Sequence, residues 1–308
     1  MTYKPIWSQK ATKINLAKPK NMEGWWITNK YDGVGSITTL NDIVQMYSIS
    51  KAKVSGEFTE FTQKVPHIIN ELNRFNFKGL LQGELIATHL PTCDENFGFV
   101  TGTLHSFDAI ERQQKGDYLR YVIYDMPSHT GKYKERYSAL KKLFDETPDL
   151  QYVSLIPILG INKNNSWVDI YNSIVDSGFE GCVLYDENNV YKHSQTNNQR
   201  NAGVIKAKAI NETEVLCIEK IEGKPSDKGG KFVGSLGALK CIDSEGRSFH
   251  CGSFKISDAE RQFIWDNVDV PFVCEIVYYQ ITDNSYKLPR FTRYRPDKDE
   301  SSWNRDDR

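Results

Sequence analysis

Short apolar runs recur along this 308-residue chain, and they constrain its fold more than any other feature. Runs at 43–49, 80–87 and 119–126 are rich in β-branched and aromatic residues, as strands are. Helical spacing of apolar residues is restricted to a few segments, at 58–75, 133–144 and 167–177. We therefore expect an α+β fold. No apolar run reaches the roughly 18 residues that a membrane span needs, so no membrane segment is expected.

The pattern changes after Ile210. Short strand-like runs follow at 214–218, 237–242, 248–251 and 271–279, with a single helical segment at 257–265, which Ser257 or Asp258 would cap. Several short strands and one helix suit a small Greek-key barrel of the OB type. We expect two domains, at 1–210 and 211–308. Residues 1–20 are interpreted as an irregular lead-in, and those beyond Lys298 as loosely held.

One polar stretch interrupts the apolar runs early in the chain. Residues 29–35, Asn-Lys-Tyr-Asp-Gly-Val-Gly, lie between the run at 25–28 and the run at 36–40. This pattern predicts a strand, a turn made by Asp32 and Gly33, and a returning strand. Lys30 would then end a strand, shielded from bulk water, where a lysine can serve as a nucleophile. The alternative is an ordinary hairpin with a surface lysine.

Further polar residues interrupt later apolar runs. Glu84 lies within the run at 80–87, and Glu180 lies between glycines just before the run at 182–185. A buried carboxylate is costly unless something pairs with it, although Glu84 could also face solvent on an edge strand. Tyr124 could be a core residue, or it could offer its ring to a base. Lys206 and Lys208 alternate with apolar residues, so both face one side of a strand, as a phosphate clamp or as solvent-facing gatekeepers.

Taken together, these residues resemble the motifs of the covalent nucleotidyltransferases, and specifically of the small ATP-dependent DNA ligases of phages and viruses. The resemblance covers nearly the whole chain, and its six motifs occur in the family's order: Lys30-Tyr31-Asp32-Gly33, Gly83-Glu84-Leu85, Tyr124-Asp125, Glu180-Gly181, Lys206-Ala207-Lys208 and Arg295-Pro296-Asp297-Lys298. The implied fold is a nucleotidyltransferase (adenylation) domain of antiparallel sheets and helices, followed by the OB barrel.

The chain departs from the family pattern at several positions. The arginine that closes the first motif is Gly35 here, so its contact is absent or comes from another residue. Lys287 replaces the arginine that leads to the last motif. Ser50-Lys51 is all that remains of a Ser-Arg-x-Gly segment. Of a Lys-x-Gly-Arg-Ser-like run, residues 191–194 keep only part, and Arg200 is a candidate for its missing arginine.

The resemblance implies a reaction in three steps. Lys30 attacks the α-phosphorus of ATP, the AMP passes to the 5′-phosphate of a nick in duplex DNA, and the 3′-hydroxyl displaces it. It also implies a role for each motif: Lys206 and Lys208 neutralise the α-phosphate, Glu180 binds Mg²⁺ (or Mn²⁺), Glu84 holds the ribose, Tyr124 stacks on adenine, Asp32 organises the 3′-hydroxyl end, and Arg295 and Lys298 reach the pyrophosphate when the second domain closes.

The implied partner is nicked duplex DNA in replication, repair or recombination, bound by a monomer. Candidate DNA contacts are Lys51, Lys192 and Arg200, with Lys224, Lys228 and Lys231 of a Gly- and Lys-rich loop. The formal net charge of −1 indicates that any such surface is local. The six cysteines lack metal-site spacing, which favours free thiols in a reducing compartment, the cytoplasm, or the host's if the protein is phage-encoded.

Three alternatives remain open from the sequence. An RNA ligase or an mRNA-capping guanylyltransferase would use the same lysine chemistry, although the runs at 231–239 and 251–254 are similar to the OB domain of DNA ligases. A non-catalytic nucleic-acid-binding protein could retain the scaffold, and Gly35 and Lys287 support this possibility. An NAD-dependent ligase is disfavoured, because neither an additional N-terminal nucleotide domain nor a four-cysteine zinc site is found.

Overall fold

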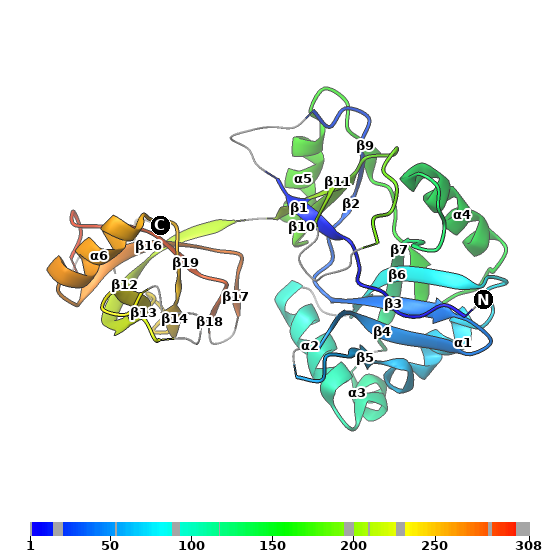
Figure 1. Cartoon of the computed structure of the whole chain (residues 1–308), viewed down its shortest axis with the longest axis horizontal. Helices are drawn as coiled ribbons and strands as arrows, with labels where there is room; N and C mark the ends of the chain where they lie inside the picture. Colours follow the sequence, from blue (N-terminus) through cyan, green and yellow to red (C-terminus); the bar gives the residue numbers. More distant parts are fainter. Residues whose placement is uncertain are drawn as a thin grey trace. The chain divides into compact units, whose positions relative to one another are not determined.

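The computed structural model describes residues 2–14, 21–52, 54–87, 93–116, 118–193, 200–208, 210–225, 232–282 and 285–299. The chain divides into two compact units, Met1–Lys208 and Ala209–Arg308 (Figure 1). None of the helices in these ranges has the length and hydropathy to span a bilayer. Each unit has its own hydrophobic core, so each is described by itself.

The first unit is built on two sheets. The five-stranded sheet has the order β1 (Lys10–Lys13), β11 (Arg200–Lys208), β10 (Gly181–Tyr185), β2 (Trp26–Asn29) and β9 (Gly160–Ile161). The six-stranded sheet has the order β5 (Phe58–Glu60), β4 (Val44–Lys51), β3 (Val34–Leu40), β6 (Gly79–Ile86), β7 (Arg120–Asp125) and β8 (Val153–Leu155). Most neighbouring strands are antiparallel, but β1 runs parallel to β11, and β7 runs parallel to β8.

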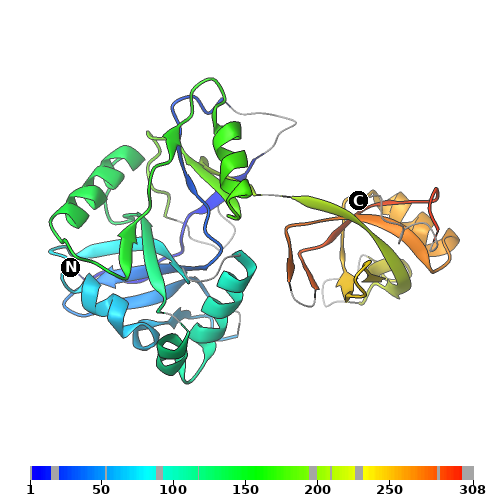
Figure 2. The same cartoon turned by 180° about the vertical axis from the view of Figure 1, so that it is seen from behind.

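Helices cover the outer surfaces of both sheets. The six-stranded sheet is covered by α1 (Pro66–Leu72), α2 (Cys93–His105) and α3 (Ala109–Lys115), and α4 (Tyr133–Asp145) packs on β7 and β8 (Figure 2). Helix α5 (Trp167–Asp176) packs on the five-stranded sheet. Leu81 and Leu85 are buried in the core that the helices complete. Their neighbours Gln82 and Glu84 therefore point to the opposite face of the sheet, because side chains alternate along a strand.

The predicted hairpin across residues 25–40 is wrong. Strand β2 pairs with β9 and β10, whereas β3 pairs with β4 and β6, so the chain crosses from one sheet to the other at residues 30–33. Gly33 is needed for close approach, because a Cβ there would collide with the backbone oxygen of Leu85 on β6. The two strands flank Lys30 as expected, but the lysine lies at a junction between sheets.

Two further predictions fail in the first unit. Residues 58–75 form the strand β5, a 3₁₀ turn (Thr62–Lys64) and only then α1, which begins at Pro66, a residue favoured at the first helical position. The supposed irregular lead-in contains β1, which pairs with β11. Helices α2 and α3 were not predicted, and a strand predicted at 155–158 is displaced, because β8 covers Val153–Leu155.

The second unit is a strongly curled sheet with one helix. Its strand order is β14 (Ser248–Cys251), β13 (Leu236–Ile242), β12 (Asn211–Glu222), β16 (Phe272–Tyr278), β19 (Arg290–Tyr294) and β15 (Ser253–Phe254), and β17 (Gln280–Thr282) pairs with β18 (Ser285–Lys287). Ser257 caps α6 (Asp258–Asn267) through a capping box with Glu260. This OB-like arrangement, with the mixed sheets and helices of the first unit, confirms the predicted α+β class.

Candidate active site

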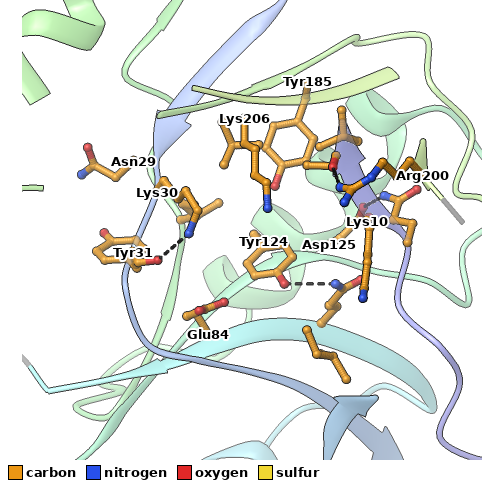
Figure 3. Close-up of a pocket in the computed structure, with 17 residues that line it drawn as sticks. Lys10, Asn29, Lys30, Tyr31, Glu84, Tyr124, Asp125, Tyr185, Arg200 and Lys206 are labelled. Atoms are coloured by element: carbon orange, nitrogen blue, oxygen red, sulfur yellow. Dashed lines mark hydrogen bonds between the residues drawn. The ribbon is translucent and has the colours of Figure 1, made fainter. Parts of the chain in front are cut away.

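A cavity of about 330 Å³ lies in the first unit, with walls contributed by both sheets (Figure 3). Its volume is within the range of small-molecule sites. From the five-stranded sheet and its ends it is lined by Gln9, Lys10, Ala11, Asn29, Lys30, Tyr31, Val183, Tyr185, Arg200, Val204 and Lys206. From the six-stranded sheet and its ends it is lined by Ile49, Gln82, Glu84, Tyr124, Asp125 and Ile156.

Lys30 is held where the chain leaves the five-stranded sheet. Its backbone N–H donates to the carbonyl of Gly181, 2.8 Å away, which extends the pairing of β2 with β10. Its ammonium group forms an ion pair with Glu180 and also donates to the carbonyl of Tyr31 at 3.2 Å. Only 18% of the Lys30 side chain is exposed, so the amine is screened from bulk water as expected.

Glu180 is shared by two lysines. Its carboxylate is only 3% exposed and accepts from the ammonium groups of Lys30 and Lys208, one on each oxygen. Register explains the meeting, because Gly181 lies opposite Lys208 and Cys182 lies opposite Asn29. A buried carboxylate is stable only with such partners. The structure thus brings together three residues that the sequence separates widely.

The wall formed by the six-stranded sheet carries the cavity's carboxylates and a tyrosine. Burial raises the pKa of Glu84 to about 7. The charge of Lys30 opposes this rise, and the charge of Asp32 adds to it. The hydroxyl of Tyr124 accepts a hydrogen bond from the Gln82 amide at 3.0 Å. Below it, Asp125 forms a two-pronged ion pair with Arg136, at 2.5 and 3.0 Å, and both side chains are fully buried.

The wall formed by the five-stranded sheet carries all four lysines and arginines that line the cavity. Burial and the charges of Lys30 and Arg200 lower the pKa of Lys206 to about 8. Burial and Arg200 also lower the pKa of Lys10. In Figure 3 the amino groups of Lys30 and Lys206 point into the space above Glu84 and Tyr124.

The predicted site residues of the first unit do not all meet. Lys30, Glu84, Tyr124, Lys206 and Arg200 line the cavity, and Glu180 and Lys208 adjoin it through Lys30. Asp32 lies in the crossover, and its charge acts on Glu84. Lys51 and Lys192 do not line the cavity either: the Lys51 ammonium lies 5.6 Å from the centre of the Phe58 ring, and Lys192 is exposed.

The predicted residues of the second unit are held by its own carboxylates. Arg295 pairs with Glu214 and with Asp297, whose oxygens lie 2.8 and 2.6 Å from the guanidinium. Lys298 pairs with Glu214 at 2.7 Å. Lys224 is exposed, and Lys228 and Lys231 lie outside the described residues.

Sequence reasoning missed the N-terminal part of the site. Gln9 donates to Asp125 at 3.2 Å, accepts from Asn201 at 2.6 Å, and lines the cavity with Lys10. Neither residue lies in an apolar run, which was the signal used to find strands. Ile49 and Tyr185 also line the cavity, but their sequence context is that of ordinary core residues.

The side chains of this site can be tested against the needs of a divalent ion. Across the described ranges, no cluster of three or more His, Cys, Asp or Glu side chains could hold a metal by itself. Mg²⁺ does not need one, because it binds through one or two carboxylates together with phosphates and water. Glu180 fits that requirement, since a cation can replace the two ammonium groups that it now neutralises.

Comparisons with known proteins agree with the geometry. Residues 5–208 match the family model of the ATP dependent DNA ligase domain. No curated protein sequence matches the chain. Among solved structures, the chain is similar to a Lig E DNA ligase, with 20% identity and a TM-score of 0.69 over 94% of this chain and 99% of that one.

Two further structures are similar. One is named Pmar-Lig_PreS3, with 21% identity and a TM-score of 0.75 over 94% of this chain and 68% of that one. The other is the ATP-dependent DNA ligase of bacteriophage T7 in complex with ATP, with 17% identity and a TM-score of 0.50 over 94% and 98%. At these identities the likeness shows a shared fold. Because the family model spans nearly all of the first unit, the chain belongs to the family of ATP-dependent DNA ligases.

Proposed function

We propose that this ligase seals nicks between a 5′-phosphate and a 3′-hydroxyl in duplex DNA through a lysyl-AMP on Lys30. The neutral Lys30 amine would form a bond to the α-phosphorus of ATP, the bond to pyrophosphate would break, and the amine would release a proton. The AMP would move to the 5′-phosphate, and the 3′-hydroxyl would then displace it. Each step is a displacement at phosphorus, which needs orientation and charge neutralisation more than covalent help.

The position of Lys30 is the observation that carries this proposal. The amine is screened from water, lies at the edge of a cavity of ligand size, and has a carboxylate partner that a cation could take over. Two further lysines of β11 adjoin it, with Lys206 in the cavity and Lys208 on the other oxygen of Glu180. An ordinary surface lysine has none of these features.

Each wall would bind a different part of the nucleotide. Lys206 and Lys208 would neutralise the α-phosphate as point charges. Glu84 would accept hydrogen bonds from the ribose, and the Tyr124 ring would stack on adenine. Glu180 would hold a Mg²⁺ or Mn²⁺ ion, which supplies positive charge to the phosphate when it is bound. Asp32 would organise the 3′-hydroxyl end in the last step.

Residues of the second unit complete the proposal. Arg295 and Lys298 would act on the pyrophosphate when the second unit closes over the first, and phosphate oxygens would then replace Glu214 as their partner. Lys51, Lys192, Arg200 and Lys224 would contact the DNA backbone, a sequence-independent interaction that weakens with salt. We also propose a cytoplasmic location, since the five cysteines whose side chains are described are free, and we propose that the protein acts as a monomer.

Adenylation with α-labelled nucleotide tests the proposal. The protein is incubated with labelled ATP or GTP and Mg²⁺, separated on a denaturing gel, and the adduct is located by mass spectrometry. Wild type should carry AMP on Lys30, and Lys30→Ala and Lys30→Arg should carry none. Lys78→Ala, which removes an exposed lysine paired with Asp42, is the matched control and should label normally.

The substrates separate the alternatives. Label from GTP and not from ATP would contradict the proposal and support a capping enzyme. Sealing of an RNA nick in preference to a DNA nick would support an RNA ligase. An adduct on another residue, or none from either nucleotide while nicked DNA is bound, would overturn the proposed chemistry.

A further inference from the structure

Another side chain occupies the space that the arginine missing from the first motif would need. Gly35 lies opposite Glu84 across β3 and β6, so a side chain there would project to the cavity face of the sheet. A Cβ at residue 35 would lie 2.8 Å from Cδ1 of Ile49, which lines the cavity. Ile49 therefore fills the space that an arginine would cross. Among its lining residues, the six-stranded sheet offers the cavity no positive charge.

Positive charge is instead concentrated on the wall formed by the five-stranded sheet. Lys10 of β1 lies directly opposite Arg200 of β11, and both side chains line the cavity (Figure 3). Three residues further along β1, Lys13 lies opposite Lys206. Like charges opposite one another destabilise a sheet. Two of the four residue pairs between β1 and β11 are like-charged in this way, which indicates that this edge of the sheet binds an anion.

The protein does not neutralise the pair at the cavity. Within the described residues, neither Lys10 nor Arg200 forms an ion pair with a carboxylate. The guanidinium donates to the carbonyl of Ala11 at 2.8 Å, which orients it without cancelling its charge. On the wall formed by the six-stranded sheet, the carboxylate of Asp125 is already bound by Arg136 and Gln9. An anionic ligand would remove the repulsion.

We propose that Lys10, beside Arg200, binds a phosphate of the reacting nucleotides and supplies from β1 the positive charge that Gly35 lacks. This inference rests on the proposed function, and it assigns a phosphate-binding residue outside every motif of the chain. The phosphate belongs either to ATP or to the 5′ end at the nick. Both are phosphate oxygens that an ammonium binds as a point charge, so experiments must distinguish them.

Equilibrium binding distinguishes the two sources without turnover. Affinity is measured for a non-hydrolysable ATP analogue, for nicked DNA with a 5′-phosphate, and for the same nick with a 5′-hydroxyl. Lys10→Ala should weaken either the analogue or the 5′-phosphate nick about tenfold, as expected for a lost charge-assisted contact. The 5′-hydroxyl nick should be unaffected. Lys10→Arg should restore most of the affinity, and Lys4→Ala, an exposed lysine outside the cavity, should match wild type.

A relocation experiment tests the link to Gly35. Ile49→Ala removes the obstruction, and Gly35→Arg places an arginine on the wall formed by the six-stranded sheet. In the Lys10→Ala background, this pair should recover at least part of the lost phosphate affinity, whereas Ile49→Ala alone should recover none. Recovery by Ile49→Ala alone would show that space, and not charge, was limiting, and would overturn the link.

Other results would overturn the assignment of Lys10 itself. These are unchanged affinity of Lys10→Ala for both phosphate ligands, equal losses on both nicks, or a Lys10→Arg protein as defective as Lys10→Ala. Failure of wild type to form lysyl-AMP would instead defeat the proposed function. The two failures are separable because binding does not require adenylation.

Discussion

The two walls of the cavity carry opposite charges, although each is an ordinary β-sheet surface. Lys10, Lys30, Arg200 and Lys206 lie on or beside strands of the five-stranded sheet, whereas Glu84 and Asp125 come from the six-stranded sheet. Burial shifts one residue of each wall toward neutrality, since it lowers the pKa of Lys206 to about 8 and raises the pKa of Glu84 to about 7. This difference in charge is the basis of our proposal that one wall binds phosphates and the other binds the nucleoside.

The walls also differ in how they are anchored. The carboxylate Asp125 is fixed from behind by a fully buried arginine, Arg136, which also donates to the carbonyls of Gly131 and Asn189 at 2.9 Å. The cations Lys10 and Arg200 have no such counter-ion in the described part of the chain. The wall formed by the six-stranded sheet therefore neutralises its buried carboxylate internally, whereas Lys10 and Arg200 on the opposite wall are left for the proposed phosphate to neutralise.

The largest effect should come from breaking that anchor. Arg136→Met leaves Asp125 buried and unpaired, which should lower the free energy of unfolding by about 3–5 kcal/mol. Chemical denaturation measures the change. Lys115→Met, which breaks an exposed pair with Glu111, is the control and should cost under about 0.5 kcal/mol. Similar losses in the two variants would refute the asymmetry between the walls.

The next largest effect should come from removing charge on the opposite wall. Lys206→Met should slow adenylation roughly 100-fold, as when one preorganised electrostatic contact is lost, without lowering stability. Because the pKa of Lys206 is about 8, its ammonium is lost as pH rises through 8. The wild-type kcat/KM for adenylation should fall above that pH, and Lys206→Arg should keep its rate there. Parallel pH profiles of the two proteins would exclude Lys206 as the charged group.

The Tyr124 ring should contribute an intermediate amount. Tyr124→Ala should weaken ATP binding by about 1–3 kcal/mol, the range for a base stacked on an aromatic ring. Tyr124→Phe loses only the hydrogen bond to Gln82 and should bind nearly as wild type. Calorimetry in a Lys30→Ala background isolates binding from chemistry. If both variants lose equal affinity, the hydroxyl matters and the stacking role is wrong.

The smallest effect is a gain of stability from Glu84→Gln. The pKa of Glu84 is raised to about 7 in the fold, so between its ordinary value of 4.5 and pH 7 the unfolded chain ionises first and stability falls. Above pH 7 the ionised carboxylate destabilises the fold by on the order of 1 kcal/mol. The cost is this small because water in the cavity screens part of the charge. Glu84→Gln should raise the melting temperature at pH 8 and leave it nearly unchanged at pH 4. A gain that is equal at both pH values would assign it to packing.

The sequence predicted individual elements better than their partners. Strands such as β6 and β7 combine apolar alternation with β-branched or aromatic residues, and α4 and α6 have clear helical spacing, so local physics suffices there. The crossover at Lys30 was predicted as a hairpin because the local sequence shows two strands and a turn but not which strands pair. Pairing is decided by non-local packing. Strand β1 (Lys-Ala-Thr-Lys) has no apolar pattern, since it lies at the end of its sheet and Lys10 lines the cavity.

The same division holds for the site. Lys30, Glu180 and Lys208 were selected on chemical grounds, and β-sheet register brings them together. Lys10 gave no signal because one lysine in a polar stretch resembles any other. Its significance depends on Arg200, which is 190 residues away along the chain and directly opposite in the sheet.

The crossover glycine sets how closely the chain approaches strand β6 just after Lys30. Gly33 rests against the backbone of Leu85, with no room for even a methyl group. The approach of β3 to β6 at this point is thus limited by a single hydrogen atom, three residues after Lys30 but outside the cavity lining. Any larger residue at position 33 would push β3 away from β6 beside Lys30. It would shift the Lys30 amine while leaving every side chain that lines the cavity chemically unchanged.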